Sequence, residues 1–241
     1  MTIKEILNKR NILIEENNSI ILNPPDSIVK LSILIAENYS ICQSFIKYMR
    51  NCYSNKISKC SFCLSPLSQA ETNATLVLVQ ELCKTGIISD LYIQDKARIH
   101  GNFSMIPKIT NFLNGDFLEL YAQYIAETVI SNVASENNED YELLHNIIVR
   151  KNDQLHELDL LMRISDKLFW CEVKSGSYSS FEKYYNLGKW LNVNPEMHIL
   201  LSAEADSKVC ESASFFYSFY ISNISDFKDK LSLMINRNLY I

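Results

Sequence analysis

Residues 155–175 constrain the fold more than any other stretch of this chain. Their sequence is LHELDLLMRISDKLFWCEVKS, in which two apolar runs flank a Ser-Asp pair. Such runs predict two buried antiparallel strands joined by a tight turn. With the turn centred on the Ser-Asp pair, Asp159 lies opposite Glu172, and Glu157 lies opposite Lys174. Because strand side chains alternate, these four project from one face, and the other face carries Leu158, Leu160, Cys171 and Val173.

Three acids and a lysine on one patch of a buried strand pair carry an electrostatic cost. Directly opposed side chains in a sheet lie about 5 Å apart, where like charges are destabilising. A divalent cation that bridges Asp159 and Glu172 offsets this cost, because hard cations prefer carboxylate oxygen. Lys174 then points toward the same site. A cation that activates water, beside a lysine that stabilises an oxyanion, is what phosphodiester hydrolysis needs.

The alternative is a solvated surface hairpin in which Glu157 and Lys174 form an ordinary cross-strand ion pair. The strongly apolar flanks, Leu160-Leu161 and 168–170, favour a buried strand pair and therefore a metal site. By the same alternation His156 points away from the charged cluster, which favours a structural role.

The surrounding pattern is that of an α/β protein. A helix is expected over 117–132, followed by three strands, a helix and a fourth strand, over 143–150, 155–163, 168–174, 179–191 and 198–202. This order, αβββαβ, is then extended by another helix, a short aromatic strand at 216–221 and a helix over 225–236.

Residues 1–109 are expected to form a smaller, mainly helical region, and residues 110–241 the domain that holds the charged hairpin. The N-terminal pattern predicts a hairpin over 11–22, one long helix over 26–50, and a loop or short helix over 51–73. A helix over 74–84, stopped at Gly86, and a hairpin over 91–103 together resemble a winged-helix unit in size.

Charge is unevenly divided between these two parts. Residues 1–109 carry 12 Lys and Arg against 9 Asp and Glu, whereas residues 110–241 carry 11 against 19. The first part is therefore the better candidate for gripping phosphates, despite a net charge of −5 for the whole chain. The five scattered glycines match neither a P-loop nor a dinucleotide-binding turn, which excludes sites of those kinds.

Cysteine usage and the apolar runs indicate the cellular setting. No stretch reads as a signal peptide or a membrane span, so we expect a cytoplasmic protein without a membrane partner. Seven cysteines without an export signal favour reduced thiols over disulfides. Cys60 and Cys63, with Cys52 and Cys83 nearby, are candidate zinc ligands, but a single CxxC pair at irregular spacing favours buried thiols.

Three short motifs follow one another within roughly residues 74–225. They are Gly115-Asp116-Phe117-Leu118-Glu119, His156-Glu157-Leu158-Asp159 and Cys171-Glu172-Val173-Lys174. Together they resemble the PD-(D/E)xK nuclease superfamily, and in wording they are closest to the nuclease domain of CARF-domain CRISPR ancillary nucleases. The resemblance implies a restriction-endonuclease-like core and an endonuclease that depends on Mg²⁺ or Mn²⁺. It also implies Asp159 and Glu172 as metal ligands, Lys174 as a catalytic residue and Glu119 as the acid that completes the site.

Two positions depart from that family's motifs, since Phe117 stands for its usual Trp and His156 for its usual Asn. Neither change removes a ligand. Residues 1–73 are too few for the CARF sensor and lack its strand–helix alternation. We therefore expect a separate activator or regulatory partner rather than control by cyclic oligoadenylate.

Other residues are candidate contacts to nucleic acid. Lys183 and Lys189 lie on the helix that follows the hairpin and either track a phosphate backbone or form that helix's solvated face. Tyr178, Tyr184 and Tyr185 are candidates for stacking on unpaired bases, although core packing is the expected use of at least two of them.

Three functions stay open at this stage. The first is a metal-dependent endonuclease acting on DNA, RNA or both, in CRISPR-associated antiviral defence. The second is a nucleic-acid-binding regulatory module with a nuclease-like scaffold, and the third is a restriction- or resolvase-type enzyme on the same fold. The intact acid-x-lysine pair favours an enzyme. Because a double-strand cut needs two active sites, a homodimer is compatible with this reading.

Overall fold

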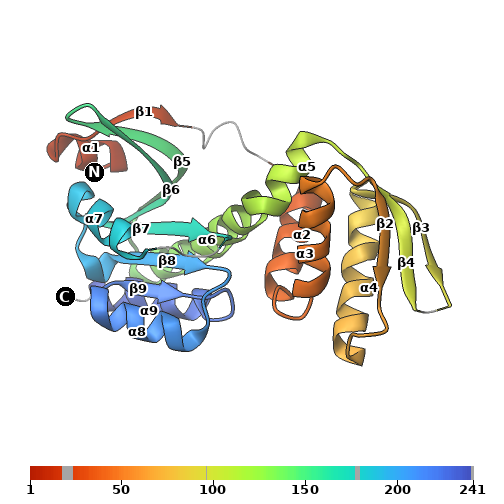
Figure 1. The fold of residues 1–241 in the computed structure, drawn as a ribbon. Coiled ribbons are helices and arrows are strands. Elements are labelled where there is room, and N and C mark those ends of the chain that lie inside the picture. The colour runs from red at the N-terminus through yellow and green to blue at the C-terminus, as the bar shows by residue number, and fades with distance from the viewer. Residues whose placement is uncertain (18–23, 96, 177–179, 240–241) are drawn as a thin grey trace. The chain divides into compact units, whose positions relative to one another are not determined.

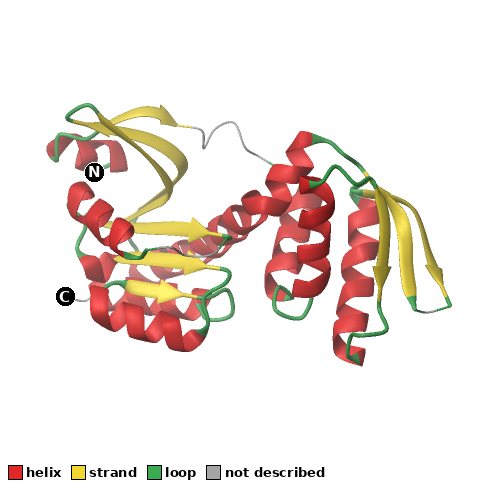
Figure 2. Cartoon of the chain, viewed as in Figure 1, coloured by secondary structure: helices red, strands yellow, loops and turns green. Residues whose placement is uncertain are grey.

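The computed structural model describes residues 1–17, 24–95, 97–176 and 180–239 (Figures 1 and 2). Packing divides the chain into two units, the first comprising residues 1–23 and 122–241 and the second residues 24–121. The helix α6 (Phe117–Asn137) begins in the second unit and continues into the first.

The first unit is built on a six-stranded sheet with the order β1-β5-β6-β7-β8-β9. An antiparallel meander forms its middle, made of β5 (Tyr141–Lys151), β6 (Gln154–Ile164) and β7 (Lys167–Lys174). Two strands continue the sheet parallel to β7, namely β8 (His198–Ser202) and β9 (Tyr220–Ser222). At the other edge, β1 (Leu13–Asn17) pairs antiparallel with β5.

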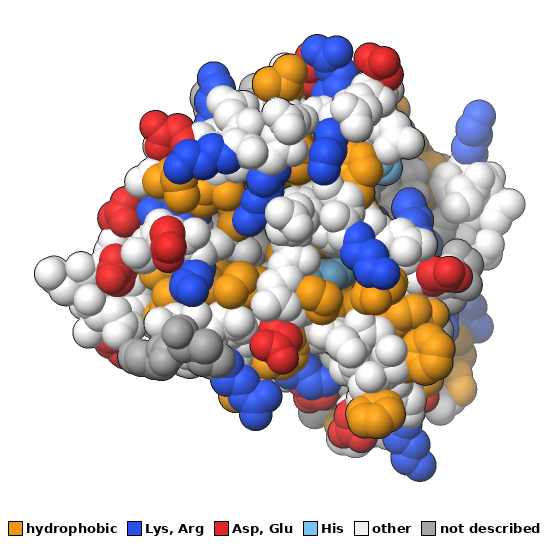
Figure 3. Space-filling view, turned by 90° about the vertical axis from the view of Figure 1, so that its left-hand side faces the viewer, with side chains coloured by type: hydrophobic (Ala, Val, Ile, Leu, Met, Phe, Trp, Pro, Cys, Tyr) orange, Lys and Arg blue, Asp and Glu red, His pale blue; other side chains and the backbone are white. Residues whose placement is uncertain are grey.

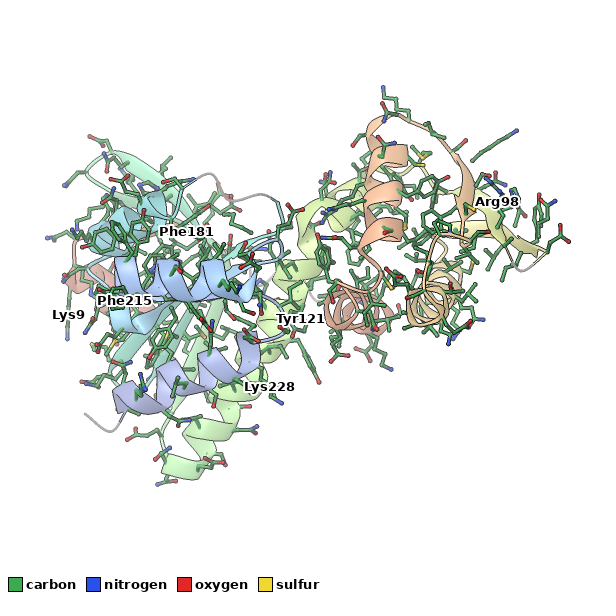
Figure 4. All side chains as sticks on the ribbon, turned by 60° about the horizontal axis from the view of Figure 1, so that its bottom comes forward. Lys9, Arg98, Tyr121, Phe181, Phe215 and Lys228 are labelled. Carbon is green, nitrogen blue, oxygen red and sulfur yellow. The ribbon has the colours of Figure 1, made fainter. Side chains whose placement is uncertain are left out.

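Helices lie against this sheet, as Figure 2 shows in red and yellow. Apolar side chains fill the core between them. One cluster joins side chains of β5 to β9 with those of α1 (Ile3–Lys9), α7 (Glu182–Leu191) and α8 (Ser207–Tyr217). The helix α9 (Phe227–Leu239) contacts β7, β8, β9 and the 3-10 turn Pro195–Met197 that precedes β8. α8 also exposes Phe215, labelled in Figure 4, which is 91% accessible. In the described part of the chain, no helix is long and apolar enough to cross a membrane.

The second unit combines helices with a small antiparallel sheet of order β2-β4-β3. Its strands are β2 (Lys59–Cys63), β3 (Ile88–Gln94) and β4 (Arg98–Phe103). Its helices are α2 (Asp26–Glu37), α3 (Gln43–Ser54), α4 (Gln69–Lys84) and α5 (Pro107–Asn111), and a π-helical turn (Phe112–Asp116) leads from α5 into α6. In β4 a Cβ on Gly101 would lie 2.9 Å from atoms of Ile88 and Ser89, so the close approach of β3 requires glycine there.

The αβββαβ order predicted from the sequence is confirmed, because α6, β5, β6, β7, α7 and β8 follow one another along the chain. The predicted hairpin turn is confirmed as well. Ile164 pairs with Lys167, which leaves Ser165 and Asp166 as the turn, and Ser165 has the positive φ of 54° that such turns use. In the second unit, the helix expected over 74–84 and the hairpin expected over 91–103 are both present.

The prediction of one helix over 26–50 is wrong, because α2 ends at Glu37 and α3 begins at Gln43. The Asn38 side chain donates a hydrogen bond to the carbonyl oxygen of Leu34 at 3.0 Å at the end of α2. Tyr39 then leaves the helix and stacks on Phe117, with ring centroids 6.0 Å apart. Apolar spacing alone did not reveal this break.

Two other N-terminal predictions need correction. The segment 51–73, expected as a loop or short helix, contains the strand β2 and the start of α4. The first run of the hairpin expected over 11–22 pairs with β5 instead, and residues 18–23 lie outside the described residues.

The packing units also divide the chain differently from the expected boundary at 109/110. The pairing of β1 with β5 places residues 1–23 with the C-terminal part of the chain. The second unit extends through Tyr121, into the first turns of α6.

Candidate active site

The hairpin of β6 and β7 opens at the level of its acidic residues. Its register continues from the turn as far as the pair Leu160–Cys171 and then stops. Beyond that pair, the backbone N–H of Val173 donates a hydrogen bond to Oδ2 of Asp159 at 2.7 Å. A carboxylate therefore satisfies a β7 backbone donor at the point where β6 leaves the ladder.

A distortion in β5 accompanies this opening. Asn146 has a left-handed φ of 50°, and the register of β5 with β6 omits the Asn146–Asp159 pair. Leu158 and Leu161 belong to the same apolar cluster, although strict alternation would place them on opposite faces. In Figure 1, β5 and β6 curve away from β7. The alternation that aligned four charged residues on one face therefore breaks at Asp159.

Asp159, Glu172 and Lys174 come together at this opening, and we call them the acid–lysine centre. Nζ of Lys174 lies 3.0 Å from Oε1 of Glu172 and 3.9 Å from Oδ2 of Asp159. Asp159 is 8% exposed and Glu172 is 5% exposed, whereas the Lys174 side chain is 37% exposed. Glu157, which was expected opposite Lys174, is exposed to solvent instead.

Burial controls the protonation of this centre. It raises the pKa of Glu172 to about 8, with the Asp159 carboxylate adding to the rise and Lys174 opposing it. Burial also raises the pKa of Asp159, against the opposing effects of Lys174 and the Val173 N–H. Burial by itself lowers the pKa of Lys174, but the charges of Glu172 and Asp159 outweigh it and raise that pKa above its usual value. The lysine is therefore held in its charged form.

The donor set suits a divalent cation. Oε2 of Glu172 is buried and has no hydrogen-bond partner within the residues that the structure describes. A buried carboxylate oxygen without a partner is costly unless a proton or a cation satisfies it. Carboxylate oxygens are the ligands that hard cations prefer. Asp159 and Glu172 are therefore the residues that could hold Mg²⁺ or Mn²⁺.

Glu119 was expected as a third acid of this site. It lies half-buried in the first turn of α6, in the part of that helix that belongs to the second unit. Over the described ranges, no group of three or more His, Cys, Asp or Glu side chains is arranged to hold a metal ion. The role of Glu119 stays a prediction.

The helix α7 presents basic side chains, of which Lys183 is the one linked to the centre. Nζ of Lys183 and Nζ of Lys174 lie 5.7 and 5.8 Å from the centroid of the same ring, that of the buried Tyr184. Lys189 lies over Tyr185 instead, 4.2 Å from its ring centroid. Tyr178, the third stacking candidate, lies outside the described residues.

His156 and Trp190 form a contact that the sequence did not single out. The two rings meet edge to face, with centroids 4.6 Å apart, so His156 faces α7. The sequence contains one indication of this contact. Lys183, Asn186 and Trp190 are spaced so that they lie on one side of a helix, which groups polar and aromatic side chains there.

The cysteines are all free thiols. Burial raises the pKa of Cys60 to about 12, with contributions from Cys52 and Cys83, which therefore lie near it. Burial thus disfavours the thiolate form of Cys60, whereas hydrogen bonding at Ser65 lowers the pKa of Cys63. Cys52 and Cys60 are buried as expected, whereas Cys63 and Cys83 are only partly buried.

Comparison with known proteins identifies solved structures with a similar fold. The chain contains a restriction-endonuclease-like α/β core, built on the sheet of the first unit. No protein-family model and no curated protein matches the sequence. Among solved structures, Can2 from Sulfobacillus thermosulfidooxidans, in complex with cyclic tetra-adenylate, matches 98% of this chain with a TM-score of 0.66 at 15% identity. Protein VC1899 from Vibrio cholerae also matches 98% of it, with a TM-score of 0.63 at 16% identity.

These likenesses show the fold. The chain spans about three fifths of each of those proteins, 62% of Can2 and 61% of VC1899. At such identities, what the chain does must be argued from its own residues.

Proposed function

We propose that this chain is a metal-dependent endonuclease that hydrolyses phosphodiester bonds of DNA, RNA or both, in CRISPR-associated antiviral defence. One observation carries the proposal: two buried carboxylates, one with an unpartnered oxygen, lie beside a lysine that contacts both. The motifs that resemble the nucleases of CRISPR ancillary systems contain the same three residues. The fold shared with Can2, solved with cyclic tetra-adenylate, supports the same class.

Each residue of the acid–lysine centre has its own role in the proposed reaction. Asp159 and Glu172 hold Mg²⁺ or Mn²⁺, with Glu119 as the further acid. The cation supplies charge neutralisation and activation of water. Lys174, kept protonated by both carboxylates, places a positive charge where negative charge grows on the phosphate during hydrolysis. The Val173 N–H keeps the Asp159 carboxylate in place.

The test is cleavage of matched substrates under controlled metal conditions. Single- and double-stranded DNA and RNA of one sequence are incubated with the protein in Mg²⁺, Mn²⁺ or EDTA. We expect cleavage with either metal and none in EDTA, and Asp159→Asn in metal should behave as wild type does in EDTA. The matched control is Asp140→Asn, which removes an acid that contacts β6 outside the acid–lysine centre and should keep the activity.

Other outcomes identify the alternatives. Binding of nucleic acid without cleavage in any metal would leave the regulatory module as the function. Cleavage confined to branched or sequence-specific duplexes would indicate a resolvase- or restriction-type enzyme on this fold.

A homodimer and a separate activator belong to the same proposal. Two active sites are needed to cut both strands of a duplex, so a double-strand cut should accompany a dimeric mass in light scattering. Full activity of the pure protein without any added factor would exclude a required activator.

A further inference from the structure

A hollow of about 510 Å³ is lined by residues at the start of β6 and residues of α7. We call it the α7 hollow, and its lining includes Gln154, His156, Lys183, Asn186, Leu187 and Trp190. Its volume falls within the range of about 300–1,000 Å³ that is typical of small-ligand sites. Figure 3 shows the side of the molecule that carries α7, where Lys and Arg side chains lie among apolar ones.

The aromatic wall of the α7 hollow is held in a fixed orientation. Nε1 of Trp190 donates a hydrogen bond to Oε1 of Gln154 at 2.9 Å. Nζ of Lys151 lies 5.7 Å from the Trp190 ring centroid and donates to the Trp190 carbonyl oxygen at 3.0 Å. With the edge contact to His156, these interactions set the indole before any ligand arrives. Such preorganisation lowers the entropic cost of binding.

Lys183 connects the hollow to the acid–lysine centre. It lines the hollow, and its ammonium shares the Tyr184 ring with that of Lys174. Burial raises the pKa of Asp159, and the positive charge of Lys183 opposes that rise. Burial also lowers the pKa of His156, and Lys183 adds to that effect. Lys183 is therefore within electrostatic reach of both sites.

We propose that the α7 hollow binds one unpaired nucleobase of the strand whose phosphate lies at the acid–lysine centre. This inference rests on the proposed nuclease function and names the substrate class, single-stranded or locally unpaired nucleic acid. Trp190 provides the stacking surface and His156 the adjoining wall. Gln154 and Asn186 provide amide groups for the edge of the base, and Lys183 contacts the intervening backbone phosphate.

The chemistry of the lining favours a base over other occupants. Stacking on an aromatic ring is available to every base once it is unpaired, and cationic side chains alongside track the backbone. In a duplex the faces of the bases are covered by their neighbours, so the hollow would exclude paired DNA and RNA. The amides have donors and acceptors that suit the edges of bases.

The first experiment measures binding in EDTA, where no cleavage occurs. Stacking is worth about 1–3 kcal/mol per base, so Trp190→Ala should weaken binding of a single-stranded oligonucleotide by about 5- to 150-fold. Trp190→Phe keeps a ring and should retain most of the affinity, which separates stacking from a loss of folding. Tyr185→Ala removes an aromatic of the same helix that does not line the hollow and should have little effect. Duplex binding should be unchanged in all three variants.

The second experiment locates the base. Single-stranded substrates, in DNA and RNA series, each carry one abasic position, moved stepwise past the cleaved bond. One abasic position next to that bond should weaken wild-type binding as much as Trp190→Ala does, and the two changes together should cost no more than either alone. This non-additivity is the signature of a direct contact.

The outcomes separate this inference from the proposed function. If metal-dependent cleavage occurs but Trp190→Ala and every abasic substrate bind as wild type binds the intact strand, the hollow is not a base site while the nuclease stands. If affinity falls with Tyr185→Ala rather than Trp190→Ala, the stacking site lies elsewhere on α7. If no substrate is cut in any metal, the nuclease proposal fails whatever the binding results show.

Discussion

Two clusters of charged side chains each include one residue of β6. One surrounds Arg163, and the other is the acid–lysine centre, which contains Asp159. Each cluster combines two acids with one base. In the first cluster the base is buried. Nη1 and Nη2 of Arg163 donate to the two carboxylate oxygens of Asp140 at 3.0 and 2.8 Å, and Nε lies 3.6 Å from Glu142. The Asp140 side chain is 72% exposed. In the acid–lysine centre the arrangement is reversed, with buried acids and a half-exposed Lys174.

The two arrangements shift the pKa values of their acids in opposite directions. Hydrogen bonds from Arg163 lower the pKa of Asp140, whereas burial raises the pKa of Asp159 and takes that of Glu172 to about 8. The count of charges is the same in both clusters, so the count cannot distinguish a structural ion pair from a candidate metal site. The sign of the charge that is buried does distinguish them, because buried excess acid needs a proton or a cation.

Among variants that keep both carboxylates of the acid–lysine centre, the largest effect is expected from Lys174→Ala. Removing one group that stabilises the charge of a transition state typically costs about 10²–10³-fold in rate, so cleavage should fall by that factor. Lysine is not a ligand for the cation, and Mn²⁺ binding measured by calorimetry should persist. Lys167→Ala, at the turn end of the same strand, is the matched control and should keep the wild-type rate. Cleavage by Lys174→Ala within a few-fold of wild type would remove Lys174 from the mechanism.

Arg163→Met should affect stability and leave the chemistry alone. Losing a buried guanidinium and its charge-assisted hydrogen bonds should cost about 3 kcal/mol, which lowers the melting temperature by about 6–12 °C. The cleavage rate per folded molecule, measured well below that temperature, should match wild type. A variant that melts normally but has lost activity would show that the Arg163 cluster belongs to the active site.

Asp159→Asn tests the centre without nucleic acid. Excess Mn²⁺ at 100 times its dissociation constant adds about 2.7 kcal/mol to the stability of a protein that binds it only when folded. The melting temperature of wild type should rise accordingly, and that of Asp159→Asn should not. In EDTA above about pH 8, where Glu172 is ionised, the variant should be slightly more stable than wild type, because one of two repelling buried carboxylates is gone and the amide oxygen still accepts from Val173. Lower stability in EDTA and an unchanged Mn²⁺ response would make Asp159 a structural residue.

The smallest effect is expected from Asp140→Asn, and it depends on pH. Arg163 holds the pKa of Asp140 below its unfolded value, so this pair stabilises the fold above the unfolded pKa. The contribution is lost as the pH falls through the folded pKa. Thermal melts should therefore show the variant a little less stable than wild type at pH 7, with the gap closing in acid. A gap that widens in acid would contradict the assignment.

The sequence predicted the hairpin of β6 and β7 because its signals are local. Apolar runs on both sides of Ser165-Asp166 specify strand, turn and register together, and the register holds from Ile164 to Leu160. The break between α2 and α3 depends instead on Tyr39 stacking on Phe117, a residue far along the chain. β2 was missed for a similar reason, since the polar segment Lys59–Cys63 becomes a strand only by pairing with β4.

The candidate site also has features that depend on contacts between segments far apart in the sequence. Asp159, Glu172 and Lys174 were expected together and lie together, but the expected pair of Glu157 with Lys174 did not form. The hairpin opens there instead, next to a left-handed residue, Asn146, in a third strand. Nothing in the spacing of residues 155–175 records that event.

The edge position of β1 has a consequence for how the chain is made. β1 leaves the ribosome before its partner β5, and the whole of the second unit is translated between them, so β1 stays unpaired while residues 24–121 are made. An unpaired strand is prone to join strands of other chains, and like charges discourage such pairing. Glu15 and Glu16 place two negative charges on that waiting strand. These two charges therefore protect β1 against aggregation until β5 is available to pair with it.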